Sequence, residues 1–172
     1  YGATRTLVIN SLLLFSGSRF GRGLISEGGV NFDINDKTRL ELDKNLTKVL
    51  RDSELMGDTL FSRASVLSRL EQTGVISTET ARSIGMVGLT ARASGLSLDV
   101  RADHPHGFYV FNPVHKRIMT SGDVFARAYM RHIEIKQSLE LVLELLQNMP
   151  RDERLMREIK SLKPDTLTVS MT

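Results

Sequence analysis

The residues most able to do chemistry lie close together, in the stretch from Leu89 to Tyr109. Charged and imidazole side chains are concentrated there: Arg92, Asp99, Arg101, Asp103, His104 and His106. The stretch shows little helical or strand periodicity, and such a connection between helices commonly carries function. Side chains of these types can form ion pairs, dock on a partner or handle protons. We therefore expect a defined polar network in this stretch.

Arg92 is the first candidate in that network. Its planar guanidinium fork suits a carboxylate, and Asp99 and Asp123 are the acceptors we consider. Small residues follow Arg92, including Ser94, and they allow the backbone to lie flat against another surface. A structural ion-pair network is the favoured interpretation, and a docking or proton-handling role is the alternative.

The histidines give a weaker signal for metal binding. His104 and His106 are two positions apart, a spacing seen in metal-binding pairs, but a proline separates them and only His115 and His132 occur elsewhere. The chain has no cysteine, which excludes disulfides, thiolate metal sites and iron–sulfur ligation by its own residues. We predict that this chain holds neither a metal nor a cofactor by itself.

A long helix should position the charged stretch. It is predicted to begin at a cap formed by Ser121 or Asp123, and to run for about seven turns to just before Pro150. One face is apolar, and a second stripe carries polar residues at steps of four, three and four: Arg127, Arg131, Glu134 and Ser138.

We expect the charged stretch to pack against this polar stripe, because buried charges persist only when they are paired and hydrogen-bonded. The expected contacts are Asp99 or Asp103 with an arginine of the stripe, and Arg92 or Arg101 with Glu134 or Asp123.

The remaining elements predict a mainly α fold with short β pieces, an α+β helical bundle with a long helix in its C-terminal half. Helical patterns cover residues 5–15, 36–55, 59–71 and 77–84, and a charged helix is predicted over 152–160. Short β pieces are predicted at 24–25 and 30–33, around Gly28 and Gly29, and also at 108–114 and 166–172. The glycine pair is interpreted as a hairpin turn, with close backbone approach to a partner as the alternative.

The composition fits one globular domain. The chain has 172 residues, of which 41% are hydrophobic and 25% charged. Its formal net charge of +3 comes from mixed rather than blocked charges, so we predict no nucleic-acid partner. The longest apolar run, Leu12 to Phe15, is far short of the ~20 residues of a membrane span. We predict a cytoplasmic or peripheral location.

Several motifs also carry a family resemblance. Arg92-Ala-Ser-Gly, then Asp99-Val-Arg and Asp103-His-Pro, resemble the central region of the [NiFe]-hydrogenase-like large subunits. Collinear matches run from about residue 12 to 149, including Gly122-Asp-Val-Phe-Ala-Arg on the long helix. The family contains membrane-bound energy-converting hydrogenases, formate hydrogenlyase and the 49 kDa quinone-site subunit of respiratory complex I.

The resemblance implies the central part of an oxidoreductase subunit, as a single domain and an excised internal segment. Family hydrogenases hold a nickel–iron centre with two Cys-x-x-Cys pairs, and this chain has neither pair. The chain would then be a scaffold piece of a larger parent, itself a candidate for a nickel–iron centre. The implied partners are other subunits, including an Fe–S small subunit, which would keep it peripheral to the inner membrane.

The resemblance leaves the branch of the family open. The Asp103-His-Pro motif favours a proton-reducing hydrogenase of the formate hydrogenlyase type. A fragment of a complex I quinone-site subunit is the alternative, and so is an interaction module without chemistry of its own.

Overall fold

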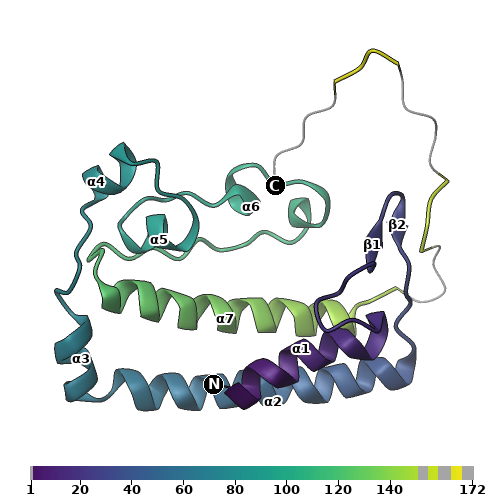
Figure 1. The fold of residues 1–172 in the computed structure, drawn as a ribbon, viewed down its shortest axis with the longest axis horizontal. Coiled ribbons are helices and arrows are strands. Elements are labelled where there is room, and N and C mark those ends of the chain that lie inside the picture. Colours follow the sequence, from purple (N-terminus) through teal and green to yellow (C-terminus); the bar gives the residue numbers. More distant parts are fainter. Residues whose placement is uncertain (1, 151–154, 159–163, 168–172) are drawn as a thin grey trace. The chain divides into compact units, whose positions relative to one another are not determined.

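A computed structural model describes residues 2–150, 155–158 and 164–167 of the chain. The structure is mostly helical with one small antiparallel sheet, which confirms the predicted fold class (Figure 1). The elements in chain order are α1 (Gly2–Ser16), β1 (Ile25–Ser26), β2 (Gly29–Val30), α2 (Asp36–Phe61), α3 (Ala64–Leu70), α4 (Thr78–Ser83), α5 (Gly88–Ala93), α6 (Val100–Asp103), the 3-10 helix η1 (Gly107–Val110) and α7 (Val124–Gln147).

The chain divides into two compact units. The first unit contains residues 1–53 and 139–172, and the second contains residues 54–138. The long helices α2 and α7 contribute to both units. Whether the units unfold together as the single domain expected from the chain length stays a prediction.

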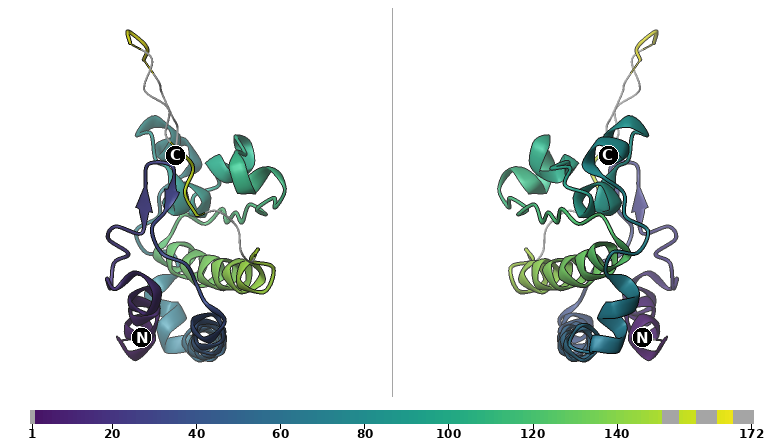
Figure 2. Two further views of the ribbon diagram at one scale, coloured as in Figure 1. Left: turned by 90° about the vertical axis from the view of Figure 1, so that its right-hand side faces the viewer. Right: turned by 90° about the vertical axis from the view of Figure 1, so that its left-hand side faces the viewer.

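Leucine and valine side chains form the core of the first unit. In α2 the buried residues Leu42, Leu46 and Val49 are four and three positions apart, which places them on one helical face. They pack with Leu139 and Leu146 of α7, and Leu7 and Phe15 of α1 pack against the same cluster. The three helices lie side by side in Figures 1 and 2. Asn35 caps α2, since its side-chain oxygen accepts from the Thr38 amide at 2.9 Å.

The hairpin β1–β2 also lies in the first unit. Ile25 pairs with Val30 and Ser26 with Gly29, and Gly28 occupies the turn with φ of 89°. This confirms the hairpin predicted around the glycine pair. The charged helix predicted over 152–160 is wrong for residues 155–158, which are not helical and include a β-bridge between Met156 and Gly29. The other residues of that predicted helix, and all but the first two residues of the predicted strand at 166–172, lie outside the described residues.

Three local predictions fail in the second unit. The helix expected over 59–71 is divided, because α2 continues to Phe61 and α3 begins only at Ala64. The stretch expected to lack periodic structure contains α5 and α6, whose six and four residues are too short to show a helical period. The β piece expected at 108–114 is wrong, because its first three residues belong to η1. Within the described residues no strand lies beside this apolar run to pair with it.

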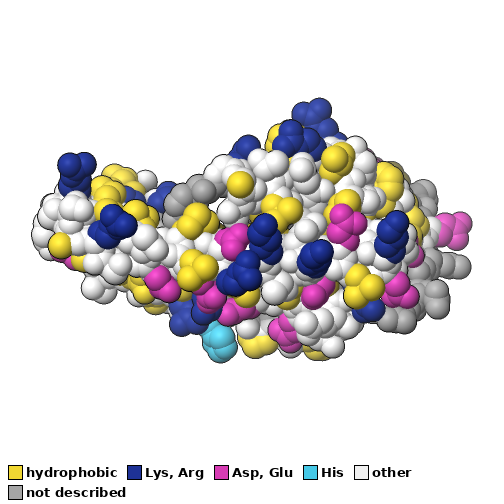
Figure 3. Space-filling model, turned by 90° about the horizontal axis from the view of Figure 1, so that it is seen from below, with side chains coloured by type: hydrophobic (Ala, Val, Ile, Leu, Met, Phe, Trp, Pro, Cys, Tyr) yellow, Lys and Arg dark blue, Asp and Glu magenta, His cyan; other side chains and the backbone are white. Residues whose placement is uncertain are grey.

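The surface agrees with the mixed charge of the sequence. On the face shown in Figure 3, Lys and Arg side chains are interspersed with acidic and hydrophobic ones. Among the described residues, no helix combines the length and the hydropathy that crossing a membrane requires.

Candidate functional site

Small buried residues place α5 so that Arg92 is buried. Ala91 and Ala93 have no exposed surface, and Ala91 packs with Ala81 of α4 and with Leu96. Gly95 follows with φ of 89°, where an added Cβ would lie 2.6 Å from the Thr78 hydroxyl oxygen. The α5–α6 connection lies so close against α4 that position 95 has no room for a side chain.

Arg92 joins three segments of the second unit. Its Nε and Nη2 donate to Oε1 of Glu134 on α7, at 3.0 and 2.5 Å. Its Nη1 donates to the Leu98 carbonyl at 3.0 Å and lies 3.5 Å from Oδ2 of Asp99. The side chains of Arg92, Asp99 and Glu134 are 7%, 5% and 22% exposed. This is a largely desolvated ion-pair network, as the sequence predicted.

Asp99 extends the network to α6. It caps that helix by accepting from the Arg101 amide, and its carboxylate also accepts from Arg101 Nε and Nη2, at 3.0 and 2.8 Å. The side-chain hydrogen bond from Arg101 is the main reason why the pKa of Asp99 lies below its ordinary value, although burial opposes the shift. Arg101 is 36% exposed, so the network reaches the surface through this side chain.

Asp103 ends the charged stretch in a separate pair. It accepts from Lys116 and, through its other oxygen, from the Asp99 amide at 2.8 Å. Lys116 also donates to the Ser97 carbonyl at 3.2 Å. The hydrogen bond from Lys116 lowers the pKa of Asp103. Sequence reasoning missed Lys116, because nothing in its local pattern sets it apart from a solvated lysine.

Asp123 fixes the start of α7. Its carboxylate accepts from the Ala126 amide at 2.7 Å, from the Gln72 amide at 3.0 Å and from the Ser121 hydroxyl at 3.1 Å. Burial by itself raises the pKa of Asp123, but these hydrogen bonds together bring it below the ordinary value. Of the two caps that the sequence allowed, Ser121 and Asp123, the structure has Asp123, which also holds the chain between α3 and α4.

The predicted contacts between loop and helix are found only in part. Arg92 pairs with Glu134, as expected. The two aspartates bind Arg92, Arg101 and Lys116 rather than the arginines of α7. Arg127 instead donates to the carbonyls of Gly122 and Gly74, and Arg131 donates to the carbonyl of Arg127. These arginines lie in the first turns of α7, where nearby backbone carbonyls satisfy their donors.

The other candidates of the charged stretch form no catalytic constellation. His104 and His106 are exposed, with His106 Nδ1 3.3 Å from the His104 carbonyl oxygen. The described residues contain no group of three or more side chains able to hold a metal ion. Ser94 is fully buried, and within the described structure its hydroxyl has no hydrogen-bond partner.

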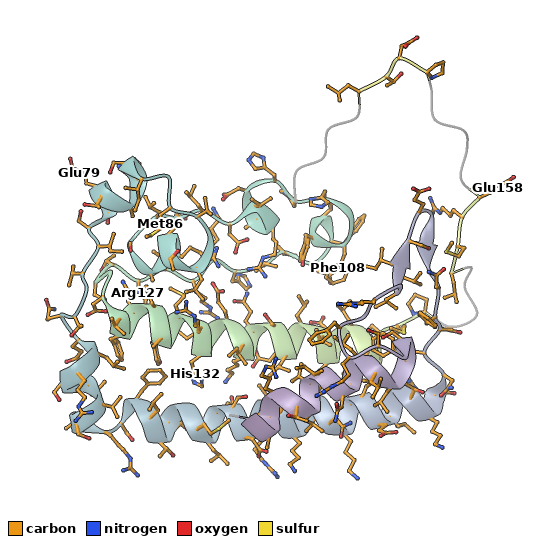
Figure 4. The ribbon with its side chains drawn as sticks, in the orientation of Figure 1. Glu79, Met86, Phe108, Arg127, His132 and Glu158 are labelled. Carbon is orange, nitrogen blue, oxygen red and sulfur yellow. The ribbon has the colours of Figure 1, made fainter. Side chains whose placement is uncertain are left out.

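A second feature was missed, the contact between Gly57 and His132. The His132 ring lies between α2 and α7 (Figure 4), and a Cβ on Gly57 would lie 2.6 Å from its Nδ1. Phe61 and Tyr129 surround the ring, with centroids 5.8 and 6.1 Å from it. A lone glycine inside a helical pattern was the available signal.

Comparison with known proteins places the chain. Residues 2–171 match the family described as respiratory-chain NADH dehydrogenase, 49 Kd subunit. The chain belongs to this family. It is 33% identical over 143 residues to an NADH-quinone oxidoreductase subunit of Chloroherpeton thalassium, with 81% of this chain and 32% of the relative covered. It is 27% identical to the corresponding NADH-quinone oxidoreductase subunit of Clostridium beijerinckii, with 93% and 43% covered.

A solved structure supports the same assignment of the fold. The membrane-bound sulfane sulfur reductase, an archaeal respiratory membrane complex, contains a chain with a TM-score of 0.84 and 26% identity. The alignment covers 95% of this chain and 44% of that one. This 49 kDa-type chain therefore spans less than half the length of the relatives it matches.

These matches bear on the branch of the family expected from the sequence. The preference for a hydrogenase or formate hydrogenlyase, which rested on Asp103-His-Pro, is not confirmed. The relatives are named NADH-quinone oxidoreductases, so the complex I alternative has the better support.

The ion-pair network can stabilise the local fold and expose charged side chains at the surface. Arg92 and Arg101 balance Asp99 and Glu134, so the network is neutral and most of its donors are satisfied. Such a network orients α5 and α6 on α7, because each buried charge is stable only in its paired geometry.

Proposed function

We propose that the chain forms the central helical part of a 49 kDa-type subunit in a respiratory complex that transfers electrons from NADH to a quinone. The family match over residues 2–171 is the observation that carries the proposal, and the names of the relatives supply the substrate class. On this proposal the chain's own residues contribute scaffold geometry, and the redox groups are held elsewhere in the complex.

The ion-pair network gives the scaffold its fixed geometry. Arg92 ties the α5–α6 segment to Glu134, and Asp103 with Lys116 ties the end of α6 to the segment before α7. A partner subunit would meet the exposed part of the network at Arg101, together with the nearby exposed His104. Docking of a partner at this surface is proposed because an exposed charged side chain is held there in a fixed position by the ion-pair network.

Assembly with other subunits is part of the same proposal. The relatives are named as subunits of an oxidoreductase, and the solved neighbour belongs to a respiratory membrane complex. We propose that the chain sits at the periphery of a membrane complex through its partner subunits, one of which carries the Fe–S chain that passes electrons.

A proton-reducing hydrogenase subunit is the second candidate. Asp103-His-Pro supports it through the resemblance of that motif to the hydrogenase branch. A nickel–iron centre requires thiolate ligands, and this chain has no cysteine, so every thiolate would come from the rest of the subunit.

The test measures which electron acceptor the complex uses. The complete complex is purified with the full subunit that contains this chain. NADH oxidation with a soluble quinone, hydrogen evolution from a reduced viologen dye, and sulfide release from polysulfide are measured on one preparation. We expect NADH oxidation that depends on the quinone. Hydrogen evolution without quinone reduction would favour the second candidate, and sulfide release alone would favour the activity named for the structural neighbour.

A matched pair of variants connects the activity to the network. Arg92→Ala should lower the yield of assembled complex and the quinone activity together, because the α5–α6 segment loses its attachment to α7. Arg131→Ala should leave both unchanged, because Arg131 donates only to a helix carbonyl among the contacts described. Equal effects of the two variants would contradict a role for the network in assembly.

A further inference from the structure

One edge of the β1–β2 hairpin, along β2, is paired with a segment that is distant in the same chain. The Val30 amide donates to the Leu155 carbonyl at 3.1 Å, and the Arg157 amide donates to the Gly28 carbonyl at 2.9 Å. Met156 lies opposite Gly29 as an antiparallel β-bridge. All these residues belong to the first unit.

Gly29 makes this approach possible. A Cβ at this position would lie 3.2 Å from the Met156 Cα, and closer still to the Leu155 carbonyl oxygen. Paired residues between two such hydrogen bonds bring their Cα atoms closest, to about 4.5 Å in antiparallel sheets. The need for glycine comes from the backbone conformation of Gly29, because at its φ of 158° a Cβ would overlap the Leu155 carbonyl oxygen.

The bound segment contributes mainly through its backbone. Leu155 and Met156 remain 38% and 37% exposed, so neither side chain is buried by the pairing. A side-chain hydrogen bond accompanies the backbone bonds, from the Ser26 hydroxyl to the Met156 sulfur at 3.7 Å. Recognition of a strand by main-chain hydrogen bonds is the mode known as β-augmentation.

We propose that the β1–β2 hairpin is a strand-acceptor site, selective for an extended backbone through Gly29, and that residues 155–157 of the same chain occupy it. The site joins residues 155–157 to the hairpin in the connection between α1 and α2. A hairpin with two residues in each strand is marginal alone, so the added segment and the hairpin stabilise each other. This proposal is independent of the electron acceptor.

Amide hydrogen exchange on the full chain tests the site. The Val30 and Arg157 amides should exchange slowly in the native chain, and Gly29→Ala should accelerate both by about tenfold or more. Gly2→Ala is the matched control, because an added Cβ there meets nothing within 4 Å, and it should change neither rate. Leu155→Ala and Met156→Ala should change both rates by less than about threefold, because the backbone bonds are kept.

A second variant removes the hydrogen bond between Arg157 and Gly28 by changing the bound segment and leaving the hairpin sequence intact. Arg157→Pro lacks the amide that donates to Gly28, and it should also accelerate exchange at Val30, on the neighbouring bond. If Val30 and Arg157 exchange in the native chain at the rate of an unstructured peptide, the site is absent. If Arg157→Pro leaves Val30 exchange unchanged, the segment is not held as a strand. Either result overturns the proposal.

Discussion

The two units bury their interiors with different chemistry. The first unit packs large aliphatic side chains, such as Leu42 and Leu46, between three helices. In the second unit the fully buried positions include Ala81, Ala91 and Ala93, and charged groups are buried beside them. Aliphatic packing depends on filled volume, whereas a buried ion-pair network depends on complete pairing. The same truncation should therefore act through a cavity in one unit and through unpaired charge in the other.

The largest effect is expected at Arg92. Arg92→Ala leaves Glu134 and Asp99 without their buried cation, and breaking a buried pair costs about 3–5 kcal/mol. Urea unfolding should show the lowered midpoint. A double-mutant cycle with Glu134→Ala should give strongly non-additive effects. Arg131→Ala is the control and should change the free energy of unfolding by less than about 1 kcal/mol. If both arginine variants behave alike, the polar network does not stabilise the second unit.

The matching change in the first unit is Leu42→Ala. Leu42 is buried among α1, α2 and α7 side chains, and a cavity at such a site costs about 3 kcal/mol. Leu40, which is 67% exposed on the same helix, is the control, and Leu40→Ala should cost no more than about 0.5 kcal/mol. Thermal unfolding followed by circular dichroism measures both. Equal losses would mean that α2 does not pack through the face that contains Leu42.

Replacing Gly57 by alanine tests the packing of the second unit through the sign of the change in the free energy of unfolding. Alanine in place of glycine normally stabilises a helix interior by about 1 kcal/mol. At Gly57 the new Cβ would overlap the His132 ring, so Gly57→Ala should destabilise the chain, by about 2 kcal/mol.

The double variant Gly57→Ala with His132→Ala isolates that overlap. Without the imidazole ring the alanine meets no obstacle from it, so the double variant should be at least as stable as His132→Ala alone. Urea midpoints of all three variants check this. An increased midpoint for Gly57→Ala alone would show that the ring does not rest on the glycine.

The smallest effect concerns pH. Because hydrogen bonds outweigh burial, the folded-state pKa of Asp123 lies below its ordinary value of 3.8. A lowered pKa stabilises the fold above the unfolded-state value, and this stabilisation is lost as the pH falls through the folded-state pKa. Asp123→Asn keeps a capping side chain, so it should cost about 1 kcal/mol at neutral pH. The difference from the native chain should shrink below about pH 4, as measured by urea unfolding across pH. A constant difference would exclude this linkage.

Much of the first unit could be predicted from sequence because its signals are local. Leu42, Leu46 and Val49 recur at helical spacing, and Asn35 and the Gly28-Gly29 pair mark a cap and a turn. The candidate site was predicted less completely. Asp123 was one of two candidate caps, with Ser121, from its position before an apolar helix. The hydrogen bond from the Gln72 amide to Asp123 could not be predicted, because a contact between residues 51 positions apart leaves no local sequence pattern.

The sequence by itself determined the long helices, their caps, the hairpin and a stretch in which charges must pair, because periodicity and capping depend on near neighbours. Only the tertiary structure decided which charges pair. Arg92 pairs with Glu134 as expected, but Asp99 pairs with Arg101 and Asp103 pairs with Lys116. The partners of a charge depend on which carbonyls and side chains the fold brings within reach, and several pairings satisfy the same composition equally well. For the same reason the sequence could not show why positions 57 and 29 need glycine. Their lack of a Cβ matters only because His132 and Leu155 lie against them.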